Sequence, residues 1–294
     1  MNTVKVNAFA KVNLYLDIVG ANGEYHQLDT LVTSITLFDA ITISKRNDNC
    51  VNLLMRGEFA KGIPLGEDNN AVKAAQAFII KNNLDVGVDI IIDKKIPVGS
   101  GLGGSSADIA GTLIGMQALF KTDCDIKQIA DSLGSDSGYM LTGGWARLNG
   151  RGDIVTDLSE IDKKLNLIIL MPEGGCSTKD VFALYDSEPS SIKENGVNRL
   201  IGQLLSGDLA NCVLYNALKA PAERLNGGIK AAFTALKAAG AKKVFLSGSG
   251  SAVCGVFDSE SALDAAYDSL KLQGQNAYKA QTLTAKEVAK KLFD

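Results

Sequence analysis

The residues best suited to chemistry lie in one short segment, PVGSGLGGSSAD, residues 97–108. This segment holds four glycines and three serines. Each glycine costs roughly 0.5–1 kcal/mol of backbone entropy in ordered structure, so four of them exceed what a tight turn requires. Unobstructed N–H groups before a helix N-terminus form an anion site, to which Ser105 and Ser106 add hydroxyls that can hold a phosphate oxygen or Mg²⁺. The segment predicts a phosphate-binding loop.

Two other interpretations of the loop stay open. Gly99, Gly101 and Gly104 match Gly-x-Gly-x-x-Gly, which is typical of dinucleotide-dependent oxidoreductases. That motif usually opens the first βαβ unit of its domain, whereas a long stretch of different pattern precedes it here. The plain structural alternative is a strand-to-helix turn without a ligand. No Gly-Lys pair occurs in the chain, which excludes a Walker A loop.

Three further stretches place polar residues at defined points. In AFAKVNLYL, Lys11 and Asn13 share the polar face of a strand. In SLGSDSGYMLTGG, Asp136 follows a glycine that ends a helix, and in FLSGSGSAVCGVF a Gly/Ser turn separates two apolar strands. Taken singly, each pattern also has a purely structural interpretation. Lys11 and Asn13 fit a solvent-exposed sheet face, Asp136 fits a turn residue, and the Gly/Ser segment fits a hairpin turn.

Residue counts exclude several classes of site. His26 is the only histidine, so metal centres built on two or three histidines are excluded, and a catalytic triad would have to use His26. Five widely spaced cysteines without a Cys-x-x-Cys pair argue against a disulfide framework or a zinc knuckle. This cysteine usage is typical of a reducing compartment, and we expect the cytoplasm.

Length and charge describe an ordinary globular protein. The 294 residues suffice for one large domain or two of ordinary size. A net charge of -3 gives no overall attraction to nucleic acid or to an anionic membrane. No apolar run is long enough to span a bilayer, and the N-terminus lacks the apolar core of a signal peptide. We therefore expect no nucleic-acid or membrane partner, and a monomer or weak homodimer.

The elements that must position these residues follow from periodicity. Val4–Val19 alternates like a half-buried strand, with one polar face that includes Lys5, Asn7, Lys11, Asn13 and Asp17. Further strands are predicted at 27–44 and 88–93, and helices at 67–83, 106–120 and 125–134. Asp68 or Asn69 is a plausible N-cap for the first of these helices.

A strongly apolar strand at 163–172 restarts a strand-then-helix pattern. We place a domain boundary within 155–165, which gives domains of residues 1–160 and 161–294. Two short strands then flank the Gly/Ser turn within 241–258, before a closing helix, strand and helix. The class is α/β or α+β.

The order of these motifs resembles the GHMP kinase superfamily over nearly the whole chain. An N-terminal strand with a polar lysine, a Pro-x-x-x-Gly-Leu-Gly-x-Ser-Ser loop that opens a helix, and a late Gly/Ser turn are its three motifs. The resemblance implies an α+β fold with a ribosomal-S5-like N-terminal domain and a ferredoxin-like C-terminal domain. It also implies ATP over the glycine loop, with Mg²⁺.

Four stretches place the chain nearest to the branch that phosphorylates a cytidine diphosphate-linked polyol: AKVNLYLDIVGANGEYHQLDTL, EDNNAVKAA, IDKKIPVGSGLGGSSAD and FLSGSGSAVCGVF. By this resemblance the catalytic residues are Lys11 and Asp136. The resemblance implies an ATP-binding set of Asn69, Lys95, Pro97, Gly99, Ser100, Gly101, Leu102, Gly103, Gly104, Ser105 and Ser106, of which Ser106 is also the metal ligand. It implies a substrate-binding set of Asn13, Tyr25, His26, Phe182, Gly248 and Ser249.

These residue types suit that chemistry. A cytosine between Tyr25 and Phe182 gains roughly 1–3 kcal/mol from stacking, and His26 can read its polar edge. Lys11 can stabilise charge that develops during transfer to an alcohol, while Asp136 accepts or orients the hydroxyl proton. A lysine close to Asp136 weakens the carboxylate as a base, so orienting is the more important of the two roles.

The chain also departs from the superfamily pattern. Ser105 stands where a glycine is usual, Ala107 replaces a serine, and Ser137, Gly138 and Tyr139 replace Val-Pro-Phe. Two alternatives therefore remain beside the main hypothesis: a kinase for another alcohol, such as homoserine, mevalonate or a sugar, and a non-catalytic nucleotide-binding regulator on the same fold.

Overall fold

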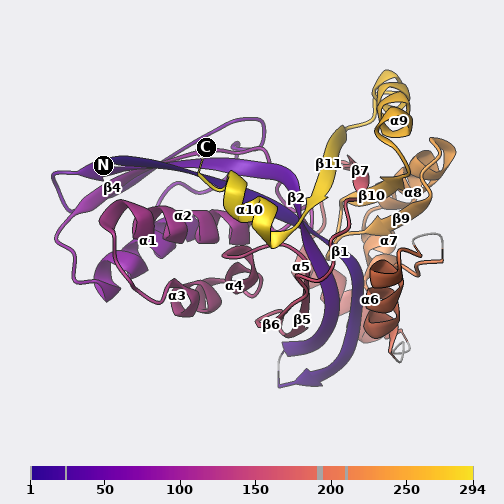
Figure 1. Ribbon diagram of the computed structural model, residues 1–294, viewed down its shortest axis with the longest axis horizontal. Coiled ribbons are helices and arrows are strands. Elements are labelled where there is room, and N and C mark those ends of the chain that lie inside the picture. The colour runs from indigo at the N-terminus through magenta and orange to yellow at the C-terminus, as the bar shows by residue number, and fades with distance from the viewer. Residues whose placement is uncertain (1, 24, 191–194, 209–210, 294) are drawn as a thin grey trace.

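A long antiparallel hairpin of β1 (Thr3–Asn22) and β2 (Tyr25–Arg46) runs through the molecule (Figure 1). The computed structural model describes residues 2–23, 25–190, 195–208 and 211–293. Within these ranges the strands form one connected sheet, whose main path is β3-β4-β2-β11-β7-β10-β9. The hairpin belongs to a first lobe, and the strands that follow β11 in this order belong to a second.

The first lobe forms around β2, which has different neighbours along its length. Its C-terminal half pairs with β4 and its N-terminal half with β5, both antiparallel. The remaining strands of this lobe are β3 (Val51–Arg56), β4 (Gly87–Asp93), β5 (Ala146–Gly150) and β6 (Ile154–Asp157). Its helices are α1 (Asn70–Lys81), α2 (Gly104–Phe120), α3 (Ile126–Leu133) and α4 (Ser137–Met140), which gather on one side of the hairpin (Figure 1).

The second lobe is an antiparallel sheet with helices packed on it. Its strands are β7 (Asn166–Leu170), β8 (Tyr215–Asn216), β9 (Lys243–Leu246), β10 (Val253–Phe257) and β11 (Ala277–Leu283). Its helices are α5 (Thr178–Ser187), α6 (Gly196–Ser206), α7 (Lys219–Leu225), α8 (Gly228–Ala238) and α9 (Glu260–Leu272). β8 is not paired with this antiparallel sheet: among the described residues it pairs only with β1, in parallel, which adds a second contact between the lobes.

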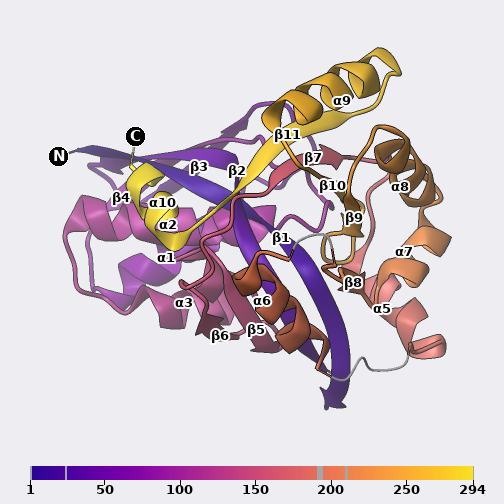
Figure 2. The ribbon, with the colours of Figure 1, turned by 45° about the vertical axis from the view of Figure 1, so that its right-hand side comes forward.

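The C-terminal segment returns to the first lobe. β11 pairs with β7 over most of its length and with β2 at its end, where Leu283 faces Ser34 (Figure 2). Helix α10 (Ala285–Lys291) then packs on β1, where Val288 joins a small apolar cluster with Phe9. The division into residues 1–160 and 161–294 stays a prediction, since this segment crosses back over it.

The predicted elements are confirmed in type and order, and Asn69 caps α1 by accepting a hydrogen bond from the N–H of Ala71 at 2.8 Å. The half-buried character of the first strand was wrong. Among its polar residues Lys5 is exposed, whereas Asn7, Lys11, Asn13 and Asp17 are buried. Alternation alone does not reveal that other segments, α10 and the glycine loop among them, cover this polar face.

The part of the chain that the structure describes contains no helix with the length and apolarity needed to traverse a bilayer.

Candidate active site

The glycine loop joins β4 to α2 and depends on left-handed backbone angles. Gly99, Gly101 and Gly103 have φ values of 66°, 75° and 76°. A Cβ on Gly101 would lie 2.1 Å from the carbonyl oxygen of Ser247, and one on Gly103 would lie 2.4 Å from Cε of Met140. Gly103 is the N-cap of α2 and offers no side-chain acceptor, so the first N–H groups of the helix remain free to bind an anion.

The carbonyl oxygens of this loop are occupied by the protein. The N–H groups of Ser251 and Ala252 donate to Gly99 and Ser100 at 3.2 and 3.0 Å. The hydroxyl of Ser247 donates to Gly101 at 3.0 Å, and the N–H of Lys11 donates to Leu102 at 3.0 Å. With these oxygens already bonded, the loop can present its N–H groups to an anion. The Gly/Ser turn of the second lobe thus holds the loop of the first.

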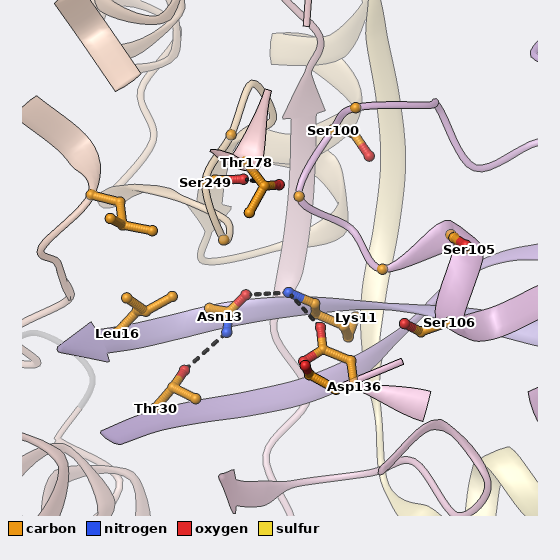
Figure 3. A pocket seen from close by; sticks show the side chains of 18 of the residues that line it. Lys11, Asn13, Leu16, Thr30, Ser100, Ser105, Ser106, Asp136, Thr178 and Ser249 are labelled. Atoms are coloured by element: carbon orange, nitrogen blue, oxygen red, sulfur yellow. Dashed lines mark hydrogen bonds and ion pairs between the residues drawn. The ribbon is translucent and has the colours of Figure 1, made fainter. Parts of the chain in front are cut away.

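Lys11 and Asp136 meet beside this loop. The Lys11 Nζ lies 3.4 Å from Oδ2 of Asp136 and 2.5 Å from Oδ1 of Asn13 (Figure 3). The amide of Asn13 donates in turn to Thr30 at 2.9 Å, which fixes the side-chain oxygen toward the lysine. Lys11 is 4% exposed, whereas the Asp136 side chain is 29% exposed. A buried ammonium therefore lies against a carboxylate that a ligand can reach.

These groups open into one cavity of about 730 Å³. The cavity brings together most of the predicted residues: Lys11, Asn13, Tyr25, His26, Pro97, Gly99, Ser100, Gly101, Gly103, Gly104, Ser105, Ser106, Asp136, Phe182, Gly248 and Ser249. Ser105 and Ser106 lie in the first turn of α2 (Figure 3).

Three predicted ligands do not line the cavity. Leu102 is fully buried in the core and contributes only its backbone. Asn69 uses its side chain to cap α1 and to donate to the carbonyl of Pro64 at 2.7 Å. The ammonium of Lys95 lies over the ring of Phe38, 5.2 Å from its centroid. The neighbouring lysine, Lys94, lines the cavity instead.

Lys94 forms a buried cluster under the loop. Its Nζ lies 2.6 Å from Oδ2 of Asp39 and 2.5 Å from Oδ2 of Asp108. Asp39 also accepts the N–H groups of Lys95 and Ile96, at 2.6 and 2.8 Å. The second oxygen of Asp108 has no partner among the described residues, and burial raises the pKa of Asp108 to about 7. The pair of lysines in IDKKIP was visible in the sequence, but not which one faces inward.

At the far end the cavity is lined by rings. The rings of His26 and Phe182 have centroids 4.7 Å apart and are tilted by 36°. The Nε2 of His26 lies 2.6 Å from Oδ1 of Asp186, which is four residues beyond Phe182 on the same face of α5. Tyr25 is 55% exposed, and the guanidinium carbon of Arg151 lies 4.9 Å from its ring centroid.

Sequence reasoning missed several residues of this cavity. Arg151 and Thr178 line it, and Thr178 hydrogen-bonds to Ser249 at 3.0 Å. Asp186 orients His26 without lining the cavity. Their partners lie far away in the chain, so no local pattern could have indicated these contacts.

The class of protein follows from this geometry together with two family matches. The GHMP kinases N terminal domain matches residues 69–146, and the GHMP kinases C terminal matches residues 190–276. The chain belongs to the GHMP kinase family, and the predicted fold class is confirmed. It is an ATP-dependent small-molecule kinase, which removes the dinucleotide-dependent oxidoreductase from consideration.

Individual relatives narrow the comparison. The chain is 34% identical to a 4-diphosphocytidyl-2-C-methyl-D-erythritol kinase of Clostridium botulinum (strain Loch Maree), over 94% of this chain and 99% of the relative. It is 29% identical to the kinase of that name from Alkaliphilus metalliredigens, over 98% and 99%. A crystal structure of 4-(cytidine 5'-diphospho)-2C-methyl-D-erythritol kinase superposes with a TM-score of 0.81 at 27% identity, over 95% of this chain and 98% of the other. The homoserine kinase from Cytophaga hutchinsonii shares the fold, with a TM-score of 0.76 at 19% identity.

Proposed function

We propose that the protein transfers the γ-phosphoryl group of ATP to the 2-hydroxyl group of 4-diphosphocytidyl-2-C-methyl-D-erythritol, in the non-mevalonate route to isoprenoid precursors. The observation that carries this proposal is the continuity of one cavity. It joins a loop suited to phosphates, the pair Lys11 and Asp136, and a ring-lined end that includes Tyr25 and Phe182. The relatives named above support the choice of acceptor.

In the proposed mechanism the acceptor hydroxyl lies beside Asp136. The carboxylate accepts a hydrogen bond from the hydroxyl and orients its lone pair toward phosphorus. As the new O–P bond forms, the bond between the γ-phosphorus and ADP breaks, ADP leaves, and the hydroxyl proton passes to the Asp136 carboxylate and from there to water. Lys11 stabilises the negative charge that develops on the transferring group. Because Asn13 holds the ammonium of Lys11 in place, little reorganisation is needed at the moment of transfer, and positioning supplies much of the acceleration.

The glycine loop and the first turn of α2 bind the phosphates of ATP in this proposal. No group of three or more His, Cys, Asp or Glu side chains suited to a metal occurs among the described residues. Mg²⁺ commonly takes only one or two protein oxygens and completes its shell with phosphates and water. The hydroxyl of Ser106 in the first turn of α2 therefore fits a magnesium ion that arrives with ATP and neutralises phosphate charge.

The cytosine occupies the ring-lined end. Tyr25 and Phe182 provide apolar faces for stacking, and His26 offers a polar ring atom. Asn13, Gly248 and Ser249 also line the cavity and complete the acceptor site in our proposal. The enzyme acts in the cytoplasm as a monomer or weak homodimer, without nucleic-acid or membrane partners; the net charge of -3 supports the last point.

The test is an ADP-release assay with ATP, Mg²⁺ and 4-diphosphocytidyl-2-C-methyl-D-erythritol. We expect turnover that depends on this acceptor, and none with homoserine or mevalonate. ATP binding without turnover of the cytidyl substrate would contradict the proposed acceptor and direct the search to other alcohols.

A further inference from the structure

Arg151 occupies the tip of the turn between β5 and β6, where the backbone holds it in one place. Gly150 and Gly152 on either side have φ values of 65° and 108°. The N–H of Arg151 donates to Oδ1 of Asp153 at 2.8 Å, and the N–H of Gly152 donates to Asn149 at 3.0 Å. The turn is therefore fixed, and it directs the arginine side chain into the cavity wall.

This turn lies between the two ends of the cavity. On one side the Arg151 guanidinium stands over the ring of Tyr25. On the other side the turn touches Asp136, because a Cβ on Gly152 would lie 3.1 Å from Oδ1 of that carboxylate. The turn that carries Arg151 thus contacts both the ring-lined end and the proposed site of phosphoryl transfer.

The guanidinium of Arg151 makes no hydrogen bond to the described residues. Its nearest carboxylate is Asp153, with Nε and Oδ2 3.9 Å apart. By contrast, Arg147 on the adjacent strand binds Asp29 through two nitrogens, at 2.7 and 2.9 Å. An arginine that lines a cavity with its donors unused is suited to an anionic ligand, above all a phosphate that can accept two parallel bonds.

From this position we infer that Arg151 binds the diphosphate of the acceptor substrate. The inference rests on the proposed function, since it requires an acceptor with a base at one end, an alcohol at the other and a diphosphate between them. Stacking on Tyr25 holds the guanidinium while its edge stays free for the phosphate oxygens. The residue thereby selects nucleoside diphosphate-linked alcohols over free alcohols.

The experiment compares cytidine with cytidine diphosphate (CDP), which differ only in the diphosphate. Binding of each is measured by calorimetry, with ADP and Mg²⁺ saturating the glycine loop so that CDP reports the acceptor end. For the wild type we expect CDP to bind more tightly than cytidine. In Arg151→Gln we expect this advantage to fall roughly 10- to 100-fold, as for lost charge-assisted hydrogen bonds, with cytidine binding changed less than threefold. Arg151→Lys, which keeps the charge but not the planar fork, falls in between.

Lys179→Gln is the matched control, because it removes one positive charge from the same cavity wall. An equal loss in this variant would overturn the assignment, since it would show an effect of net charge alone. A CDP advantage that Arg151→Gln leaves unchanged would overturn the inference and spare the proposed function. If the wild type binds neither cytidine nor CDP, the proposed function fails, and this inference fails with it.

Discussion

The two ends of the cavity differ in the chemical groups that line them. The loop end consists of backbone groups. The carbonyls of residues 99–102 are bonded to neighbouring segments, and Gly101 and Gly103 occupy positions that leave no room for a Cβ. The ring-lined end consists of side chains on a hairpin tip and on α5, and Tyr25 is more than half exposed. In our proposal the loop end binds the phosphates of ATP, which all ATP-dependent kinases share, and the ring-lined end binds the acceptor, which differs between them. A fold can therefore keep the first end and vary the second by exchanging side chains.

The largest effect is expected at Asp136, which lies where the two ends of the cavity meet. We expect Asp136→Asn to lower kcat by roughly 10²- to 10⁴-fold, the usual range for a positioned acid or base. KM for ATP should change little, because the loop is untouched. Asp123→Asn, at an exposed position outside the cavity, is the control. Steady-state kinetics with wild-type kcat in Asp136→Asn would rule out the proposed role.

Gly101→Ala tests the claim that the loop end tolerates no side chain. The added Cβ would meet the carbonyl of Ser247, and a left-handed φ costs a non-glycine residue roughly 1–2 kcal/mol. We expect a lower melting temperature and a KM for ATP raised at least tenfold. Gly202→Ala is the control, since nothing lies within 4 Å of its Cβ position. Equal ATP binding by Gly101→Ala and Gly202→Ala would contradict this claim, because it would show that the loop can accommodate the added Cβ.

Phe182→Ala probes the other end. Loss of one stacking face worth roughly 1–3 kcal/mol should raise KM for the cytidyl substrate about 5- to 150-fold. KM for ATP should stay close to wild type, while the melting temperature should fall moderately because Phe182 also packs against the core of the second lobe. Phe59→Ala is the matched control, because Phe59 packs on Tyr278 and does not line the cavity. If KM for ATP rises and KM for the cytidyl substrate does not, the assignment of Phe182 to the cytosine-binding end is contradicted.

The smallest expected effect concerns the charges beneath the loop. Burial raises the pKa of Asp108 to about 7, above the ordinary aspartate value of about 3.9. The folded state therefore binds this proton more readily, and its contribution to stability is fully present below about pH 4 and is lost as the pH rises through 7. Compared with wild type, Asp108→Asn should gain stability between pH 5 and pH 8 in urea unfolding. The exposed Asp162→Asn should not, and parallel curves for wild type and Asp108→Asn would contradict this expectation.

The contrast between the ends also explains what could be predicted from the sequence. The loop could be predicted from its local backbone chemistry, and the meeting of Lys11 and Asp136 from short motifs whose fixed order resembles a known family. Lys94 and Arg151 were not, because one requires knowing which of two adjacent lysines faces inward and the other lies in a turn that meets Tyr25 only after folding. Burial of the polar face of β1 was missed for the same reason, since the segments that cover it are distant in the chain.

The return of α10 to β1 has a consequence for biosynthesis. The side chain of Asn7 donates to the carbonyl of Lys291, and its N–H donates to that of Leu292, both at 2.9 Å. Asn7 lies on β1, the strand that carries Lys11. This strand is synthesised early, but its contacts with α10 can form only after residues 285–292 have been synthesised. While the ribosome adds the residues between them, Phe9 and its neighbours lack their cover and are exposed to misassembly. The proposed catalytic strand therefore remains uncovered in the nascent chain until residues 285–292 have been synthesised.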